Sequence, residues 1–93
     1  LPPGAGLSLA DAQWLIAHHV RLVGVDALSV ETEASVYAGA PVHRTLLGNN
    51  VLIAENVTNL GSIVGRKTRI FALPLRVKGS DAGHARIIAE VLN

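Results

Sequence analysis

Two short apolar runs constrain the fold of this chain more than any other feature of its sequence. The first is VRLVGVDA, from Val20 to Ala27, and the second is VLIA, from Val51 to Ala54. Both runs are too short for an ordinary buried helix and favour strands. Because the apolar residues follow one another without strict alternation, we expect strands that are buried on both faces, as in a sheet covered by helices.

A helix is predicted before the first run. Ser8 is a favourable N-cap residue, and Asp11 stands three positions later, where the partner of a capping box belongs. The residues that recur at helical spacing predict a helix from Leu9 to His19; they are Leu9, Ala12, Leu15, Ile16 and His19. We expect the adjacent His18 and His19 to lie on the surface at the helix end, because neighbouring helical residues diverge by about 100° and do not easily chelate one ion.

The chain after the second run predicts two more strands. Residues 68–77 alternate, with Pro74 inside the stretch, which indicates an edge strand because proline donates no ladder hydrogen bond. A last short strand is expected from Ala85 to Ala89. Hydrophobic residues make up 49% of the chain and aromatic residues only 3%. With a helical turn at His43–Leu47, these features predict an α/β fold, a mixed β-sheet with flanking helices.

Charge and composition exclude several classes of function. The formal net charge is +1, which excludes strong electrostatic capture of nucleic acid or of an anionic membrane. No run approaches the roughly eighteen apolar residues of a membrane span. The chain has no cysteine, so disulfides, thiolate catalysis and cysteine-based zinc fingers are excluded.

The charged residues are few for a small domain that must cover its own surface, at 16% of the chain. We therefore expect part of the apolar surface to be covered by the rest of a longer chain or by a partner subunit. The sequence begins at Leu1 and contains no methionine. We interpret it as a fragment or a processed piece of a longer protein.

His43 and Glu55 are the candidate site residues. Glu55 ends the apolar run VLIA, where a purely structural strand would carry another aliphatic side chain. An imidazole nitrogen and a carboxylate oxygen together suit zinc or manganese. The spacing alone also allows a structural interpretation, in which His43 caps a short helix and Glu55 leaves the strand into solvent.

Two other polar groups are interpreted as structural. Asp26 and Ser29, three positions apart after the first run, resemble a nucleophile pair, but no histidine has an evident route to them. We expect a turn in which Asp26 or Ser29 binds backbone amides. His84 is expected in a solvated loop.

Several linked motifs occur in one order along the chain. They lie in three segments, LSLADAQWLIAHHVRLVGVDALSVE, HRTLLGNNVLIAENVTNLGSI and IFALPLRVKGSDAGHARIIA. The segments contain V-G-V-D-A-x-S, then H-x-x-L-L, an apolar strand ending in E-N, and A-L-P-L. This order resembles the C-terminal half of the cyclase family of metal-dependent hydrolases, the group that contains bacterial kynurenine formamidase and isatin hydrolase.

The resemblance implies a fold, a reaction and a site. Residues 1–93 would form the C-terminal portion of a single cyclase-like hydrolase domain, with the swivelling β/β/α-type cyclase fold. The implied activity is metal-dependent hydrolysis of a small amide or formyl-amide, as in release of formate from N-formylkynurenine in tryptophan catabolism. The histidine of H-x-x-L-L and the glutamate of E-N belong to the family's metal and catalytic centre, and they fall on His43 and Glu55. The implied metal is zinc or manganese.

One family motif is absent, namely H-x-x-x-H-x-D-x-P-x-H, which supplies the remaining metal ligands. We therefore expect those ligands to come from the remaining N-terminal portion or from a partner subunit, and we expect the 93-residue chain alone to be inactive. The resemblance further implies a cytoplasmic homo-oligomer that acts on a small-molecule substrate, with no nucleic acid or membrane partner.

Three questions stay open at this level. Glu55 could bind the metal, or could hold and deprotonate the attacking water. His43 could fix the ion or the developing oxyanion. The chain could also be a non-catalytic interaction or dimerisation module derived from the same fold, or the small subunit of a two-chain enzyme.

Overall fold

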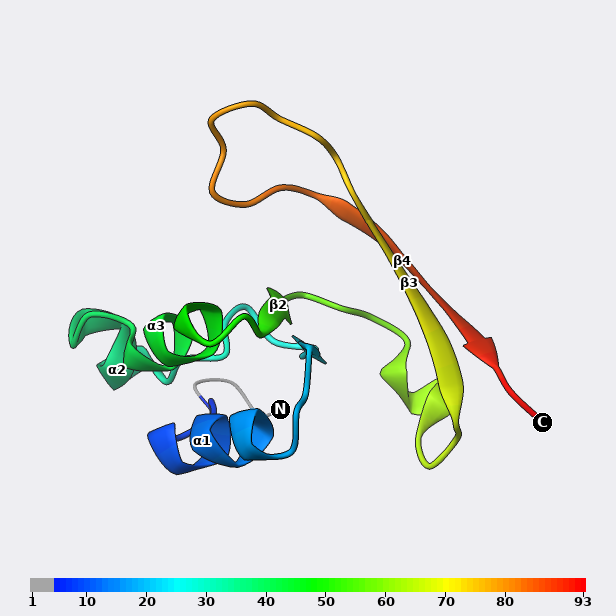
Figure 1. Cartoon of the computed structure of the whole chain (residues 1–93), viewed down its shortest axis with the longest axis horizontal. Coiled ribbons are helices and arrows are strands. Elements are labelled where there is room, and N and C mark those ends of the chain that lie inside the picture. Colours follow the sequence, from blue (N-terminus) through cyan, green and yellow to red (C-terminus); the bar gives the residue numbers. More distant parts are fainter. Residues whose placement is uncertain (1–4) are drawn as a thin grey trace. The chain divides into compact units, whose positions relative to one another are not determined.

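The computed structural model describes residues 5–93 and divides the chain into two units, one ending at Thr58 and the other beginning at Asn59. The first unit contains the helices α1 (Leu9–Ala17), α2 (Glu33–Tyr37) and α3 (Pro41–Gly48) and the strands β1 (Leu22–Gly24) and β2 (Leu52–Ala54). The second unit contains a 3₁₀ turn at Leu60–Ile63 and the strands β3 (Thr68–Pro74) and β4 (Ala85–Val91). Figure 1 shows the order of these elements along the chain.

The predicted N-terminal helix is confirmed, together with its capping box. The Ser8 hydroxyl accepts from the backbone N–H of Asp11 at 3.0 Å, and the Asp11 carboxylate accepts from the N–H of Ser8 at 2.8 Å. The helix ends at Ala17, two residues before the predicted end at His19. His19 has a positive φ of 59°, and this left-handed conformation stops the helix.

The two apolar runs form a parallel pair in the first unit. β1 and β2 pair in the register Leu22 with Leu52, Val23 with Ile53 and Gly24 with Ala54. Parallel neighbours need a long crossover connection, and here α2 and α3 provide it between the two strands. The sequence predicted only one helical turn, at His43–Leu47, where α3 spans Pro41–Gly48, and it did not predict α2.

The expectation that the two strands are buried on both faces is wrong for both β1 and β2, since Leu52 of β2 is 60% exposed. In β1, Leu22 and Val23 are half-buried and Gly24 is exposed. The parallel sheet of the first unit has only two strands of three residues each, and it cannot be covered on every side. Burial instead falls on Val25, just beyond the strand, and on Val51, just before β2. α1 packs against α3 beside the sheet (Figure 1), and the buried apolar residues of the unit are Ala12, Val25, Val30, Val42, Leu46 and Val51.

The second unit is an antiparallel hairpin. β3 pairs with β4 from Thr68 opposite Val91 to Pro74 opposite Ala85. The strand predicted from Ala85 to Ala89 is thereby confirmed, and it extends to Val91. Pro74 is the last residue of β3, in a position where its missing N–H is tolerated. None of residues 59–93 is buried.

The α/β class is confirmed. The strands form two separate two-stranded sheets, one parallel and one antiparallel, with helices flanking the parallel pair. Within residues 5–93, no helix is long and apolar enough to cross a membrane.

Candidate functional site

The candidate site lies where the two parallel strands end. Glu31 belongs to the segment that follows β1, Glu55 comes directly after β2, and His43 lies in the first turn of α3. The carboxyl ends of parallel strands and the N-terminus of the crossover helix meet at the same edge of an α/β sheet. The topology therefore brings together three side chains, those of Glu31, His43 and Glu55, which follow one another at intervals of twelve residues in the sequence.

The structure brings the two predicted residues into contact. His43 Nε2 lies 3.2 Å from Glu55 Oε2, and the two side chains have similar exposed fractions, 29% for His43 and 28% for Glu55. A small molecule can reach side chains that are exposed to this degree. The assignment of His43 and Glu55 as metal ligands or catalytic groups stays a prediction.

Glu31 is a third member of the site that the sequence did not predict. Its Oε2 lies 2.8 Å from His43 Nδ1, on the other side of the imidazole from Glu55. The Glu31 side chain is only 1% exposed. His43 therefore stands between two carboxylates, one buried and one accessible to solvent.

Glu31 also caps α3 from outside the helix. The N-cap residue of α3 is Ala40, which has no side-chain acceptor to offer and adopts a left-handed conformation with φ 52°. The Glu31 carboxylate accepts from the backbone N–H groups of Val42 at 3.2 Å and His43 at 2.6 Å. These are two of the N–H groups that a helix leaves without an internal partner, and a negative charge there is favoured by the helix dipole.

A fourth donor completes the surroundings of Glu31. The Ser35 hydroxyl donates to Glu31 Oε1 at 2.8 Å. Burial raises the pKa of the Glu31 carboxyl, but the hydrogen bonds from the His43 backbone and ring, from Ser35 and from Val42 outweigh it, so that the pKa lies below its ordinary value of 4.5. The group is therefore a buried carboxylate at neutral pH.

Glu55 is held by the loop that follows β1. Its Oε2 accepts from the backbone N–H of Val30 at 2.9 Å. The chain then turns at Asn56, which has a positive φ of 57°, and the N–H of Asn56 donates to the carbonyl of Ala27 at 2.8 Å. Asparagine adopts this conformation more readily than most residues. The E-N pair thus fixes the carboxylate at the strand end, where it faces His43.

His43 Nε2 and Glu55 Oε2 are spaced as two ligands of one metal ion would be. Two ligands at about 2.0–2.2 Å from one tetrahedral zinc ion lie roughly 3.3–3.5 Å apart, close to the 3.2 Å between His43 Nε2 and Glu55 Oε2. Nδ1 of His43 is engaged by Glu31 and cannot serve as a ligand. Among the residues that the structure describes, no group of three or more histidine, cysteine, aspartate or glutamate side chains is placed to hold a metal ion.

The remaining polar candidates lie outside this contact. The Ser29 hydroxyl accepts from the backbone N–H of Glu31 at 3.0 Å, which is the turn role predicted for it. His18 stacks on Trp14 with ring centroids 3.8 Å apart. His18, His19 and His84 are all exposed, as predicted.

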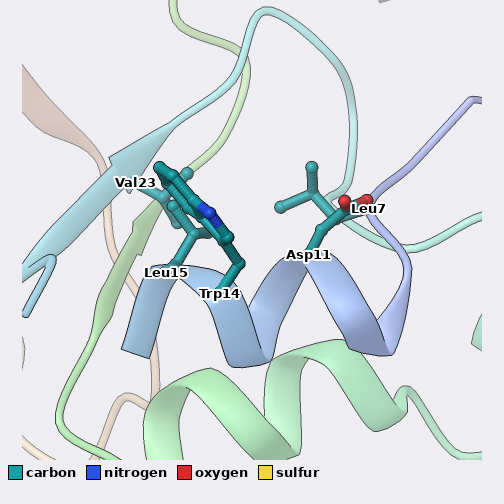
Figure 2. Close-up of a pocket in the computed structure, with 5 residues that line it drawn as sticks. All are labelled: Leu7, Asp11, Trp14, Leu15 and Val23. Carbon is teal, nitrogen blue, oxygen red and sulfur yellow. The ribbon is translucent and has the colours of Figure 1, made fainter. Parts of the chain in front are cut away.

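A separate apolar pocket lies over α1. It has a volume of about 310 Å³ and is lined by Leu7, Asp11, Trp14, Leu15 and Val23. Figure 2 shows Trp14 and Leu15 rising from α1 toward Val23 of β1. The Asp11 carboxylate is engaged in the capping box. None of the three site residues lines this pocket, so it is not the candidate site.

Sequence reasoning missed Glu31 because nothing periodic marks it in the polar stretch after Val30. One signal was present. The segment Gly39-Ala40-Pro41 opens α3 with no serine, threonine, aspartate or asparagine at the N-cap, so the first N–H groups of the helix require an acceptor from elsewhere in the chain. A buried carboxylate on the preceding loop meets that requirement.

Two curated proteins match the chain over most of its length. An uncharacterized protein of Methanocaldococcus jannaschii is 36% identical over 76 residues, which are 81% of this chain and 37% of that protein. A kynurenine formamidase of Erythrobacter litoralis is 32% identical over 86 residues, which are 92% of this chain and 38% of that enzyme. The chain thus spans less than two fifths of the length of either relative.

No family model and no solved structure matches the chain. The similarity to kynurenine formamidase indicates a distant, cyclase-like relationship with an enzyme of the hydrolase type.

Proposed function

We propose that this chain is the C-terminal part of a cyclase-family hydrolase that uses a divalent metal, zinc or manganese, to cleave a small amide or formyl-amide. The similarity to a kynurenine formamidase over 92% of the chain supports the reaction class. The observation that carries the proposal is the contact of 3.2 Å between His43 Nε2 and Glu55 Oε2 at the end of the parallel strands.

His43 and Glu55 are the residues that would hold the metal. When bound, a zinc or manganese ion supplies a hydroxide near neutral pH and polarises the substrate carbonyl. The further ligands come from a segment outside these 93 residues, which span only 38% of the formamidase. The chain by itself is expected to bind zinc weakly and to show little or no turnover.

Glu55 also has the position to handle a proton. Its carboxylate is 28% exposed and is anchored through Oε2 to the backbone of Val30, so Oε1 can face a water molecule or a substrate amide. A carboxylate in this position can accept a proton from an attacking water and pass it to the leaving nitrogen. Glu31 binds the opposite side of the His43 ring and keeps that ring from rotating away during the transfer.

The test is hydrolysis of N-formylkynurenine and of simple formyl-amides by the full-length polypeptide that carries this chain. The variants His43→Ala and Glu55→Gln are expected to lower kcat/KM by at least about 10²-fold, in the range attributed to general acid–base catalysis. Glu90→Gln is the matched control, because Glu90 is 54% exposed on β4 and pairs with Arg69. Wild-type rates in both site variants would rule out the proposed centre.

The main alternative is a non-catalytic interaction or dimerisation module of the same fold. One observation favours it, the exposed large apolar side chains on the hairpin, which include Ile70, Phe71, Leu73 and Ile88. Absence of both metal and turnover in the full-length polypeptide would favour this alternative. Restored activity on mixing with a second polypeptide would instead indicate the small subunit of a two-chain enzyme.

A further inference from the structure

We propose that Glu31 is a positioning residue for the site: it keeps the ring proton of His43 on Nδ1, so that Nε2, on the side of Glu55, keeps its lone pair for a divalent cation that the two side chains would share. The inference rests on the proposed function for the cation, but its first half concerns the protein alone. It adds a residue to the site that the sequence motifs did not include.

The donors around Glu31 fix the direction of the hydrogen bond to the ring. Oε1 receives the Ser35 hydroxyl at 2.8 Å and the Val42 N–H at 3.2 Å, and Oε2 receives the His43 N–H at 2.6 Å. A carboxyl group surrounded by donors acts as an acceptor only. The contact of 2.8 Å between Oε2 and Nδ1 therefore requires a proton on Nδ1.

The opposite ring nitrogen has a different environment. Nε2 lies 3.2 Å from Glu55 Oε2, farther than the 2.8 Å of the hydrogen bond at Nδ1, and both side chains are more than a quarter exposed, so the proton is held more strongly on the side of the buried Glu31. Once Nδ1 holds the single proton of a neutral imidazole, Nε2 presents a lone pair. Histidine ligands of metal sites commonly donate their other N–H to a carboxylate, which fixes the tautomer and raises the basicity of the ligand.

The same arrangement locks the orientation of the ring. Glu31 Oε2 binds both the backbone N–H and the side-chain Nδ1 of His43. The carboxylate is held in turn by Ser35 and Val42, and the Glu31 side chain is 1% exposed, so it has little freedom to move. Backbone and ring of His43 are thus clamped by one rigid group.

A purely structural role for Glu31 is the rival explanation, because the carboxylate also caps α3. The tautomer of the His43 ring separates the two roles, because capping of the Val42 and His43 N–H groups does not depend on which ring nitrogen carries the proton. Ser35→Ala is the matched perturbation. It removes a hydrogen bond to Oε1 and leaves the contact between Oε2 and Nδ1 intact, so it weakens the anchoring of Glu31 without changing the acceptor of the ring proton.

The first measurement is long-range ¹H–¹⁵N NMR of the His43 ring in the metal-free full-length polypeptide that carries this chain, at a pH where the ring is neutral. Free histidine holds its proton mainly on Nε2. Wild type and Ser35→Ala are expected to hold it on Nδ1, and Glu31→Gln is expected to shift the population toward Nε2. A wild-type ring protonated on Nε2 overturns the inference, even if the Glu31→Gln variant fails to fold.

The second measurement is the zinc affinity of the full-length polypeptide. Glu31→Gln is expected to weaken binding about 10- to 100-fold, as for other carboxylates that support a histidine ligand, and Glu90→Gln, a change at an exposed position of the hairpin, is expected to leave it unchanged. Unchanged affinity in Glu31→Gln would overturn the positioning role. Unchanged affinity in His43→Ala would overturn the proposed metal site instead, and the NMR tautomer alone would then decide the role of Glu31.

Discussion

Between residues 5 and 58 the chain encloses six buried apolar side chains and one buried carboxylate, whereas none of residues 59–93 is buried. The difference is not one of composition, since the hairpin strands contain Ile70, Phe71, Leu73 and Ile88, and each of these is at least 42% exposed. It arises because a two-stranded hairpin has no second layer to bury its side chains against, and such hairpins are marginal alone.

The comparison explains where the site is. His43 follows the core residue Val42 in α3, and Glu55 follows β2, which begins next to the core residue Val51. Packing of these two valines therefore fixes the backbone at both site residues. The exposed hairpin also holds paired charges, Arg69 and Glu90 at 3.0 Å, but nothing buried restrains them. The same residue types are thus held rigidly in one unit and remain solvated in the other.

The largest expected effect is loss of core packing in the first unit. Leu46→Ala should lower the free energy of unfolding by about 2–5 kcal/mol, because Leu46 is fully buried and its truncation leaves a cavity. Leu73→Ala is the matched change in the hairpin, where the side chain is 57% exposed. It should cost less than about 1 kcal/mol. Equal losses in denaturant unfolding of the two variants would contradict the comparison.

An intermediate effect is expected at Glu31, with a defined dependence on pH. Glu31→Gln should cost about 1.5–3 kcal/mol at neutral pH, since it disrupts hydrogen bonds to a buried charge. The pKa of the folded state lies below 4.5. The stabilisation is therefore complete above that value and is lost as the pH falls through the folded pKa.

Thermal unfolding of wild type and Glu31→Gln from neutral pH to about pH 3 checks this prediction. The gap between the two proteins should narrow in acid, because protonation removes the charge that the wild type uses. A gap that stays constant over the whole range would show that the charge of Glu31 contributes nothing to stability.

The smallest effect is expected at the hairpin ion pair. Arg69→Ala should lower the free energy of unfolding by only about 0.2–1 kcal/mol. Arg69 and Glu90 are both more than half exposed, and solvent screens their attraction. Chemical denaturation at low and at high salt measures it. A loss as large as that of Leu46→Ala would mean that the hairpin is held by interactions that its exposure does not indicate.

Local signals predicted much of the fold. The capping box of Ser8 and Asp11, the two short apolar runs and the strand after the loop with His84 all depend on neighbouring residues, and each was found where the pattern indicated. The extent of burial was predicted less well, since β1 is only half-buried. Burial depends on what packs against a strand, which the strand's own sequence does not contain.

The site was predicted in part for the same reason. His43 and Glu55 stand in recognisable motifs, and the structure brings their side chains together. Glu31 acts through contacts with Val42 and His43 at the start of α3 and with Ser35 of α2. Its role follows from the need to cap a helix that lacks its own N-cap acceptor, and that need becomes evident only when the start of α3 is known.

Bound zinc in the full-length polypeptide after exhaustive dialysis tests most directly whether His43 and Glu55 hold one cation together. Wild type and the control Glu90→Ala are expected to retain zinc, and His43→Ala and Glu55→Ala are each expected to lose most of it. Wild-type zinc content in both site variants would contradict the account.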